Sequence, residues 1–499
     1  MIEAQGNHGR GGRGVKLSGI LPGARFIGCD DIVVRGCKDD AARCGRGDVF
    51  VARLTDRDDG HDQVARAVAR GATGVIAERM VPTAGVPLCL VRHTDWAFAR
   101  LTQALAGDPA RSMRVIAVTG SSGKTTTSWL TASVLAEAGL AVGVLSDLGC
   151  IGPDGTTPER WEYSRPEVLA TWLARLAGEG CSHAVIEVSS RMLAAQALAG
   201  IACDTIAVTN IARAHVDLHG TPRGYRRIKS RILGSLAPHG CLVADGDGSL
   251  DRLLQRTARL LPGATSLTSG FSASCDLRAR AVERSLSGQT FLMAAGGQVA
   301  PVTVATPVRS FVRDALQAAA VGLRYGLPLE MIARGIEAAG SVPHRVERLD
   351  RGQDVPVFLD AATSGHALAS TLGGLRRLTP GRLVLLAAEE AAAAICGGEG
   401  RGGRSFLARV GRWCDDSVLV PPTIVDEDCD AQALAAYARI DRLLSTLGGR
   451  DCVLVLDRLP AAGAGPGERV PALASVVDGW LQLAHRPRAG MIGGPRRAA

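Results

Sequence analysis

Runs of aliphatic and β-branched residues alternate with segments of helical periodicity over most of the chain. In the middle of the sequence the alternation is regular, and a helical segment follows each apolar run; the runs lie at 115–119, 142–145, 184–188, 205–209 and 241–244. Strands that are apolar along their whole length and separated by helices indicate a parallel sheet with helices on both faces. Such sheets bind ligands at the carboxyl ends of their strands.

Weaker versions of the same pattern lie on either side of this region. The sequence therefore predicts an α/β fold of three domains, at 15–112, 113–343 and 344–484. Residues 277–304 alternate as strands do and have no helical signal, which indicates an antiparallel addition to the central sheet. The Gly- and Arg-rich segments at 1–14 and 485–499 are expected to be disordered, the second as a basic tail.

The composition argues against nucleic acid and membranes as partners of this protein. The 499 residues carry a formal charge of +8, but aromatic residues make up only 4%, and the arginines are spread throughout, without the basic stripe of a nucleic-acid surface. No apolar run is long enough to cross a membrane, and the first residues lack the apolar core of a signal peptide. The 13 cysteines include no Cys-x-x-Cys pair, as in reduced proteins. We expect a cytoplasmic monomer whose partners are small molecules, not nucleic acid or membrane.

The most specific motif joins the first strand of the central domain to a helix. The loop reads Gly120-Ser121-Ser122-Gly123-Lys124-Thr125-Thr126. Small residues allow backbone N–H groups to surround phosphate oxygens, and the start of a helix adds a favourable dipole. Lys124 would then contact the β- and γ-phosphates, and the Thr125 hydroxyl a magnesium ion. The alternative is an ordinary strand-to-helix turn, which is less favoured because Gly-Lys-Thr stands at the required place after a strand.

Three further groups follow strands of the same predicted sheet: Glu187, His215 and Lys229. A carboxylate and a neutral imidazole suit a hard divalent ion beside a nucleotide, whereas a charged lysine cannot bind a metal. Taken singly, Glu187 has a plain explanation as a helix cap, His215 as a loop residue and Lys229 as a solvated residue. Together with the phosphate loop they favour a metal and nucleotide site, because all three follow strands of one sheet.

Four segments of the central domain resemble the Mur ligases. They are 120–127, Glu187-Val188-Ser189-Ser190, 209–220 and 225–229. By these motifs the chain resembles the branch that adds meso-diaminopimelate or lysine to UDP-N-acetylmuramoyl-L-alanyl-D-glutamate. The resemblance runs from about residue 21 to 347 and continues weakly into the third domain. It implies an ATP-dependent amide ligase of peptidoglycan precursor synthesis that acts through an acyl phosphate.

The resemblance also implies roles for individual residues. Thr125 and Glu187 would hold one magnesium ion, and His215 would help to hold a second. Lys229 matches a lysine that is carbamylated in the family, a change that makes it a carboxylate-like ligand. Lys124, His215 and Lys229 are thus expected to be catalytic. Further contacts are implied with ATP from 120–126, Arg345 and Asp360, and with the substrate from Ser164, Arg165, Ser189 and Asn210.

The sequence departs from the family where substrates would be recognised. The family's Asp-Ser-Arg in the UDP-binding first domain is Asp39-Asp40-Ala41 here, its Thr-Thr-Pro is Ser164-Arg165-Pro166, and the Asp-Tyr-Ala-His of the Rossmann-like third domain is Asp360-Ala361-Ala362-Thr363. The arginine-containing motif that reads the added amino acid is missing near 421–424, so the usual third residue is not carried over. Three functions stay open: a cell-wall ligase, a ligase of another amide-forming pathway, and a non-catalytic nucleotide-binding protein.

Overall fold

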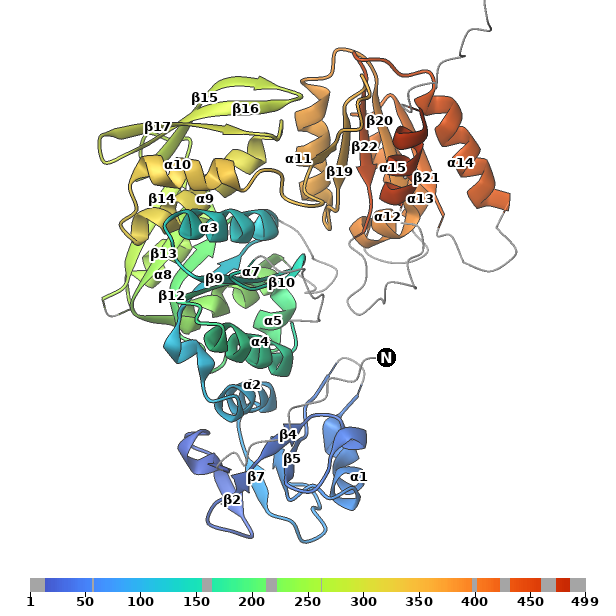
Figure 1. The fold of residues 1–499 in the computed structure, drawn as a ribbon. Coiled ribbons are helices and arrows are strands. Elements are labelled where there is room, and N and C mark those ends of the chain that lie inside the picture. Colours follow the sequence, from blue (N-terminus) through green and yellow to red (C-terminus); the bar gives the residue numbers. More distant parts are fainter. Residues whose placement is uncertain are drawn as a thin grey trace, which may run out of the picture.

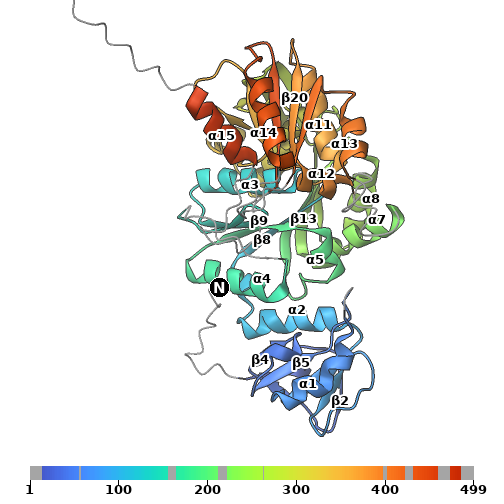
Figure 2. The same ribbon diagram turned by 90° about the vertical axis from the view of Figure 1, so that its right-hand side faces the viewer.

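The structure is a computed structural model that describes eight stretches of the chain. They are 14–55, 58–154, 164–211, 222–261, 263–396, 402–421, 431–458 and 473–484. Three α/β bodies follow one another, and the central body lies between the other two (Figure 1 and Figure 2). The α/β class with three domains is confirmed, while the domain boundaries stay predictions. The segment predicted as a basic tail and most of the predicted disordered start lie outside the described residues.

The first body is a five-stranded sheet in the order β2-β7-β6-β5-β4, with β1 paired to β3 beside it. Helices cover both faces of this sheet. Along β5, Val49 and Val51 pack with α2 on one face, and Phe50 packs with α1 on the other. The elements are β1 (Val15–Lys16), β2 (Arg25–Ile27), β3 (Val33–Val34), β4 (Gly36–Lys38), β5 (Asp48–Val51), α1 (Val64–Ala69), β6 (Gly74–Ala77), β7 (Leu88–Leu90) and α2 (Thr94–Leu105).

The central body contains a ten-stranded sheet in the order β10-β9-β11-β8-β12-β13-β14-β15-β16-β17. Its parallel strands are β8 (Arg114–Thr119), β9 (Val142–Ser146), β11 (His183–Val188), β12 (Cys203–Val208), β13 (Leu236–Asp245) and β14 (Thr265–Gly270). β10 (Gly149–Ile151) pairs antiparallel at one edge. At the other edge β15 (Leu277–Ser285), β16 (Gly288–Ala295) and β17 (Gln298–Val304) form an antiparallel meander. The predicted antiparallel addition is confirmed.

Helices cover both faces of this sheet, as its apolar strands predict. Ile116 and Val118 pack with α3, α9 and α10, whereas Val115 and Ala117 pack with α4, α5 and α8 on the other face. The helices are α3 (Lys124–Glu137), α4 (Pro166–Gly178), α5 (Ser190–Ala194), α7 (Pro222–Ser230), α8 (Ser249–Ala258), α9 (Arg309–Arg324) and α10 (Leu329–Ala338). The carboxyl ends of β8, β9 and β11 therefore reach the same edge as the start of α3.

The third body has a five-stranded sheet in the order β18-β19-β22-β20-β21, parallel except for β18. Its elements are β18 (Glu347–Leu349), β19 (Val357–Asp360), α11 (Gly365–Arg376), β20 (Leu383–Ala388), α12 (Glu389–Cys396), α13 (Gly402–Val410), β21 (Asp416–Val420), α14 (Ala431–Leu444), β22 (Cys452–Leu456) and α15 (Leu473–Ala484). Figure 1 shows α11 on the side of this body that faces the central body. Among the described residues, no helix combines the length and apolarity that a membrane span needs.

Candidate functional site

The predicted phosphate loop lies between β8 and α3, where the sequence pattern put it. Gly120 and Gly123 both have positive φ angles, of 157° and 81°. A Cβ on Gly120 would collide with the Thr209 hydroxyl, and one on Gly123 with the Asp314 carboxyl. Both glycines are therefore required by close approach as well as by backbone conformation.

The loop is supported from outside by Asn210, the second residue after β12. The carbonyl oxygen of Asn210 accepts from the backbone N–H of Ser121 over 2.9 Å. Its side chain accepts at Oδ1 from the N–H of Ser122 and donates from Nδ2 to the Ser122 carbonyl, at 3.2 and 3.0 Å. In the structure Asn210 thus supports the loop, and its contact with a substrate stays a prediction.

Glu187 lies next to the loop, at the end of β11, and its side chain is fully buried. Its Oε2 atom accepts from the backbone N–H of Asp147 over 3.1 Å, and its Oε1 atom lies 3.7 Å from Nζ of Lys124. None of the residues that the structure describes donates a hydrogen bond to Oε1. Burial and the negative charge of Asp147 raise the pKa of Glu187 to about 7, against the opposing effect of Lys124.

Lys229, in α7, is buried on the same side of the loop. Its Nζ atom donates to the hydroxyl of Thr119, the last residue of β8, over 2.9 Å, and only 1% of the residue is exposed. Burial, together with the charge of Lys124, lowers the pKa of Lys229 well below the usual range of lysine. The alternative of a solvated lysine is therefore wrong. His215 lies outside the described residues.

Arg345 reaches the loop from the segment that enters the third body. Its Nη2 atom donates to the Thr125 hydroxyl over 2.9 Å, and Nη1 donates to the carbonyl of Ala361 over 2.6 Å. The residues on either side, His344 and Val346, have φ angles of 55° and 51°, which non-glycine residues seldom adopt. One side chain thus joins the loop to the third body through a conformationally unusual connection.

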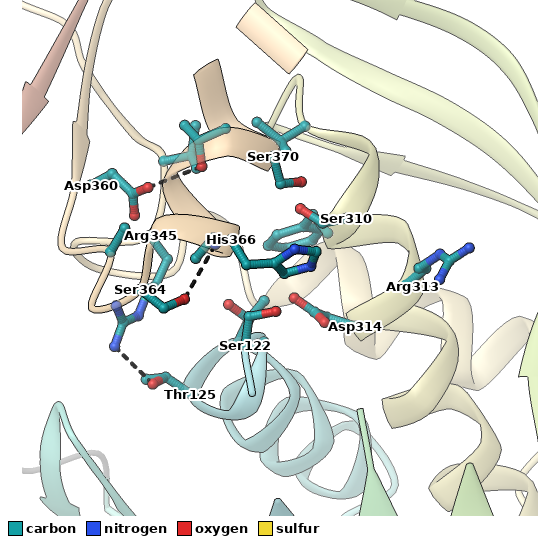
Figure 3. Close-up of a pocket in the computed structure, with 18 of the residues that line it drawn as sticks. Ser122, Thr125, Ser310, Arg313, Asp314, Arg345, Asp360, Ser364, His366 and Ser370 are labelled. Atoms are coloured by element: carbon teal, nitrogen blue, oxygen red, sulfur yellow. Dashed lines mark hydrogen bonds between the residues drawn. The ribbon is translucent and has the colours of Figure 1, made fainter. Parts of the chain in front are cut away.

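A cavity of about 350 Å³ separates the phosphate loop from the third body. Its walls come from the loop, the first turns of α9 and α11, Arg345 and Asp360. Asp360 is buried, its pKa is raised by that burial, and it accepts from the Thr371 hydroxyl over 3.0 Å. Figure 3 shows Ser122, Asp314 and His366 turned toward this cavity from three different elements. Ser121, Ser122, Gly123, Lys124, Thr125 and Thr126 all line it.

Two acidic residues of the cavity were not predicted from the sequence. Asp147 directly follows β9, and Asp314 lies in α9 with its side chain against Gly123. Only 8% of Asp314 is exposed, and burial raises the pKa of its carboxyl well above the usual range. The position of Asp147 after an apolar strand was a usable signal. Asp314 had none, because it lies within a helix and in no motif.

The remaining predicted substrate residues lie away from this cavity. Ser189 caps α5, its hydroxyl accepting from the N–H of Met192 over 3.1 Å. Arg165, next to Ser164 at the start of α4, forms ion pairs with Glu167 and, at 3.8 Å, with Asp39 of the first body. Neither Ser164, Arg165 nor Ser189 lines the cavity. The ion pair with Asp39 makes Arg165 a contact between the first and central bodies.

Comparison with known proteins places this fold and loop in one family. The model of the Mur ligase middle domain matches residues 118–322. A UDP-N-acetylmuramyl-tripeptide synthetase of Roseiflexus sp. (strain RS-1) is 31% identical over 462 residues, 87% of this chain and 88% of that protein. The UDP-N-acetylmuramoyl-L-alanyl-D-glutamate–2,6-diaminopimelate ligase of Bacillus licheniformis is 29% identical over 381 residues, 75% of each chain.

Solved structures agree at the level of the fold. A UDP-N-acetylmuramoyl-L-alanyl-D-glutamate–2,6-diaminopimelate ligase aligns with a TM-score of 0.65 and 21% identity, over 89% of this chain and 93% of that one. The MurF ligase of Thermotoga maritima, solved in complex with ADP, aligns with a TM-score of 0.59 and 18% identity, over 90% and 99%. Fold and phosphate loop define a class of ATP-dependent carbon–nitrogen ligases. This chain belongs to the Mur ligase family.

Proposed function

We propose that this protein is an ATP-dependent amide-bond ligase that acts on a UDP-N-acetylmuramoyl-peptide acceptor in peptidoglycan precursor synthesis. The observation that carries the proposal is the grouping of Lys124, Glu187 and Lys229 at one end of the phosphate loop, with two of the three side chains buried. Buried ionisable groups are costly, and a protein that only binds a nucleotide has no evident use for them.

The proposed reaction has two steps. A carboxylate oxygen of the acceptor attacks the γ-phosphorus of ATP, so that the bond to the β,γ-bridging oxygen breaks and ADP leaves. The neutral amine then attacks the carbonyl carbon of the acyl phosphate, the C–N bond forms, and inorganic phosphate departs while the nitrogen loses a proton. Lys124 would offset negative charge on the transferring phosphoryl group, and the loop N–H groups would hold the remaining phosphate oxygens.

The residues of the site fit a magnesium ion. Glu187 Oε1 is a buried carboxylate oxygen with no hydrogen bond from the described part of the chain, and a cationic guanidinium already contacts the Thr125 hydroxyl. We propose Thr125 and Glu187 as ligands of one ion and His215, with modified Lys229, as ligands of a second. When bound, magnesium neutralises phosphate charge and polarises the transferring group.

Carbamylation of Lys229 is part of the same proposal. Carbon dioxide reacts with a neutral amine, and burial, which lowers the pKa of Lys229, favours the neutral form of its amine. The reaction forms an N–C bond, releases a proton, and leaves a carboxylate-like group on the side chain. The adjacent Thr119 hydroxyl, which already accepts from Nζ, is available to orient it.

We assign the substrates to the bodies by the same analogy. The region at 15–112 would bind the UDP part, 113–343 ATP, and 344–484 the amine, with Arg345 and Asp360 contacting ATP and Ser164, Arg165, Ser189 and Asn210 contacting the acceptor. We further propose that the enzyme works as a monomer in the cytoplasm.

One observation favours a second candidate function, a Mur-type ligase of another amide-forming pathway. Arg165, the residue proposed to contact the acceptor, already forms ion pairs with Glu167 and Asp39.

Isotope exchange tests the acyl phosphate directly. ATP labelled with ¹⁸O in the β,γ-bridge is incubated with the enzyme, magnesium and UDP-N-acetylmuramoyl-L-alanyl-D-glutamate, without amine. Reversible phosphoryl transfer moves the label into a non-bridging β-position, and the exchange should require the acceptor. Scrambling that is absent with this acceptor, while ATP still binds, would remove the cell-wall acceptor from the proposal and leave the second candidate.

A further inference from the structure

Asp147 lies at the sheet edge that also carries Glu187. It follows β9 directly, and β9 pairs with β11, at whose carboxyl end Glu187 stands. The Asp147 backbone N–H donates to Glu187 Oε2 over 3.1 Å, while its side chain, 38% exposed, lines the cavity beside the phosphate loop. Asp147 and Thr125 therefore both line the cavity, and the buried Glu187 carboxylate is bonded to the backbone of Asp147.

A cation already lies beside the Thr125 hydroxyl and the Asp147 carboxylate. Nη2 of Arg345 lies 2.9 Å from the Thr125 hydroxyl and 3.8 Å from Oδ2 of Asp147. The arginine side chain is only 15% exposed. Arg345 donates hydrogen bonds to Thr125 and to the Ala361 carbonyl. Its distance of 3.8 Å from the Asp147 carboxylate is that of an ion pair and is too long for a hydrogen bond.

A second feature of the same place also indicates a cation. Glu187 is fully buried, no described residue donates a hydrogen bond to its Oε1 atom, and Nζ of Lys124 lies 3.7 Å from that atom. A buried carboxylate oxygen without a donor is a costly arrangement unless an ion completes it. Magnesium prefers such hard oxygens, with one or two carboxylates and the rest of its shell from water and phosphate.

We propose that Asp147 is an oxygen donor, directly or through one water, to the magnesium ion that accompanies the nucleotide, and that this ion takes the position now held by the guanidinium of Arg345. The inference rests on the proposed function for the assignment of Thr125 and Glu187 to the metal. Displaced from Thr125, Arg345 keeps its bond to Ala361 and presents its planar fork to phosphate oxygens, for which it is well suited. Arrival of the metal and engagement of Arg345 by the nucleotide are thereby coupled.

Manganese binding tests the proposal without relying on turnover. Mn²⁺ is titrated into the full-length protein with saturating ADP, and free Mn²⁺ is measured by electron paramagnetic resonance. Asp147→Asn preserves the size of the side chain and the backbone donor, and it should weaken Mn²⁺ binding by about 10- to 100-fold. The affinity for ADP without metal should be unchanged. Asp62→Asn, which removes an exposed acid of the first body, is the matched control and should behave like the parent.

Glu187→Gln separates this inference from the proposed function. If Glu187→Gln weakens Mn²⁺ binding and Asp147→Asn does not, Asp147 is no part of the metal site and only this inference fails. If neither substitution has an effect, the magnesium assignment in the proposed function fails with it.

The exchange between metal and arginine has its own measurement. Because the guanidinium and the metal compete for one position, Arg345→Ala should bind Mn²⁺ more tightly than the parent when no nucleotide is present. Unchanged or weaker binding in Arg345→Ala would overturn the exchange.

Discussion

Arg345 donates a hydrogen bond from Nη2 to the Thr125 hydroxyl over 2.9 Å, across 220 positions of sequence. The bond connects the entry to the third body with the phosphate loop, and the same guanidinium is bonded to Ala361 in the third body. Through Arg345, the third body is therefore linked to Thr125, the residue that is proposed to hold magnesium.

Arg345→Ala should weaken nucleotide binding, because it removes the guanidinium that is proposed to contact the phosphate oxygens. A hydrogen bond that involves a charged group contributes about 1.5–3 kcal/mol, so the affinity for ATP in the presence of magnesium should fall by roughly tenfold or more. Isothermal titration gives the affinity. Arg348→Ala, at a neighbouring arginine whose nearest carboxylate is Asp350 at 3.8 Å, is the control. Equal affinities in parent and Arg345→Ala would show that Arg345 has no part in the nucleotide site.

Lys124→Ala should abolish turnover of ATP. The substitution removes the positive charge nearest to the transferring phosphoryl group, and loss of one such group from a preorganised site costs at least about 100-fold in rate. Phosphate release measures the effect. Lys16→Ala, which removes an exposed lysine of the first body, should leave the rate unchanged. Undiminished turnover by Lys124→Ala would contradict the assignment of the phosphate loop.

Lys229→Ala should lower activity and respond to added carboxylate. If Lys229 is carbamylated, its loss removes a carboxylate-like ligand, and a short-chain carboxylate such as propionate should restore part of the rate by entering the space left by the side chain. Activity is measured against propionate concentration. Lys124→Ala should show no such rescue, because this substitution removes a positive charge, which a carboxylate cannot replace. Parental activity in Lys229→Ala would exclude the carbamate.

Asp314→Asn should change the response of the protein to pH. Burial raises the pKa of Asp314 in the folded state above its unfolded value, so its contribution to stability is present in full below about pH 4 and is lost as pH rises through the raised pKa. Above pH 4 the Tm of the parent should therefore fall relative to that of Asp314→Asn. The free energy of unfolding that is lost is about 1.4 kcal/mol for each unit by which folding raises the pKa. Asp276→Asn, at an exposed carboxylate, is the control.

The same substitution bears on nucleotide binding. The Asp314 carboxyl lies against Gly123 of the phosphate loop, so its negative charge at high pH opposes a triphosphate there. The affinity of the parent for ATP should fall with rising pH relative to Asp314→Asn. Parallel pH profiles would show that Asp314 stays protonated or does not face the phosphates.

What the sequence predicted correctly is what local pattern determines. Apolar runs such as 115–119 and 184–188 gave the parallel sheet, the spacing of Gly120, Gly123 and Lys124 gave the loop, and period-two alternation gave the antiparallel meander. These features depend on residues that are close in sequence, so the types and spacing of those residues are enough to predict them.

The parts that were missed depend on contacts distant in sequence. Asp314 resembles a solvated helix residue until α9 packs against Gly123, and only then does its burial become evident. Likewise the bonds of Asn210 to Ser121 and Ser122 were not predicted, while its contact with a substrate stays a prediction. Period and motif say which residues reach an edge of the sheet, but not which of them face each other there.

The central claim is that this chain joins an amine to a muramoyl-peptide carboxylate at the cost of ATP. The most direct test is phosphate release from ATP and magnesium with UDP-N-acetylmuramoyl-L-alanyl-D-glutamate across a panel of amino acids, with Lys124→Ala as control and product masses determined. We predict release that requires both acceptor and one class of amine, with a product of the summed mass less water. ATP binding without release for any acceptor and amine pair would contradict the claim and indicate a nucleotide-binding protein without ligase activity.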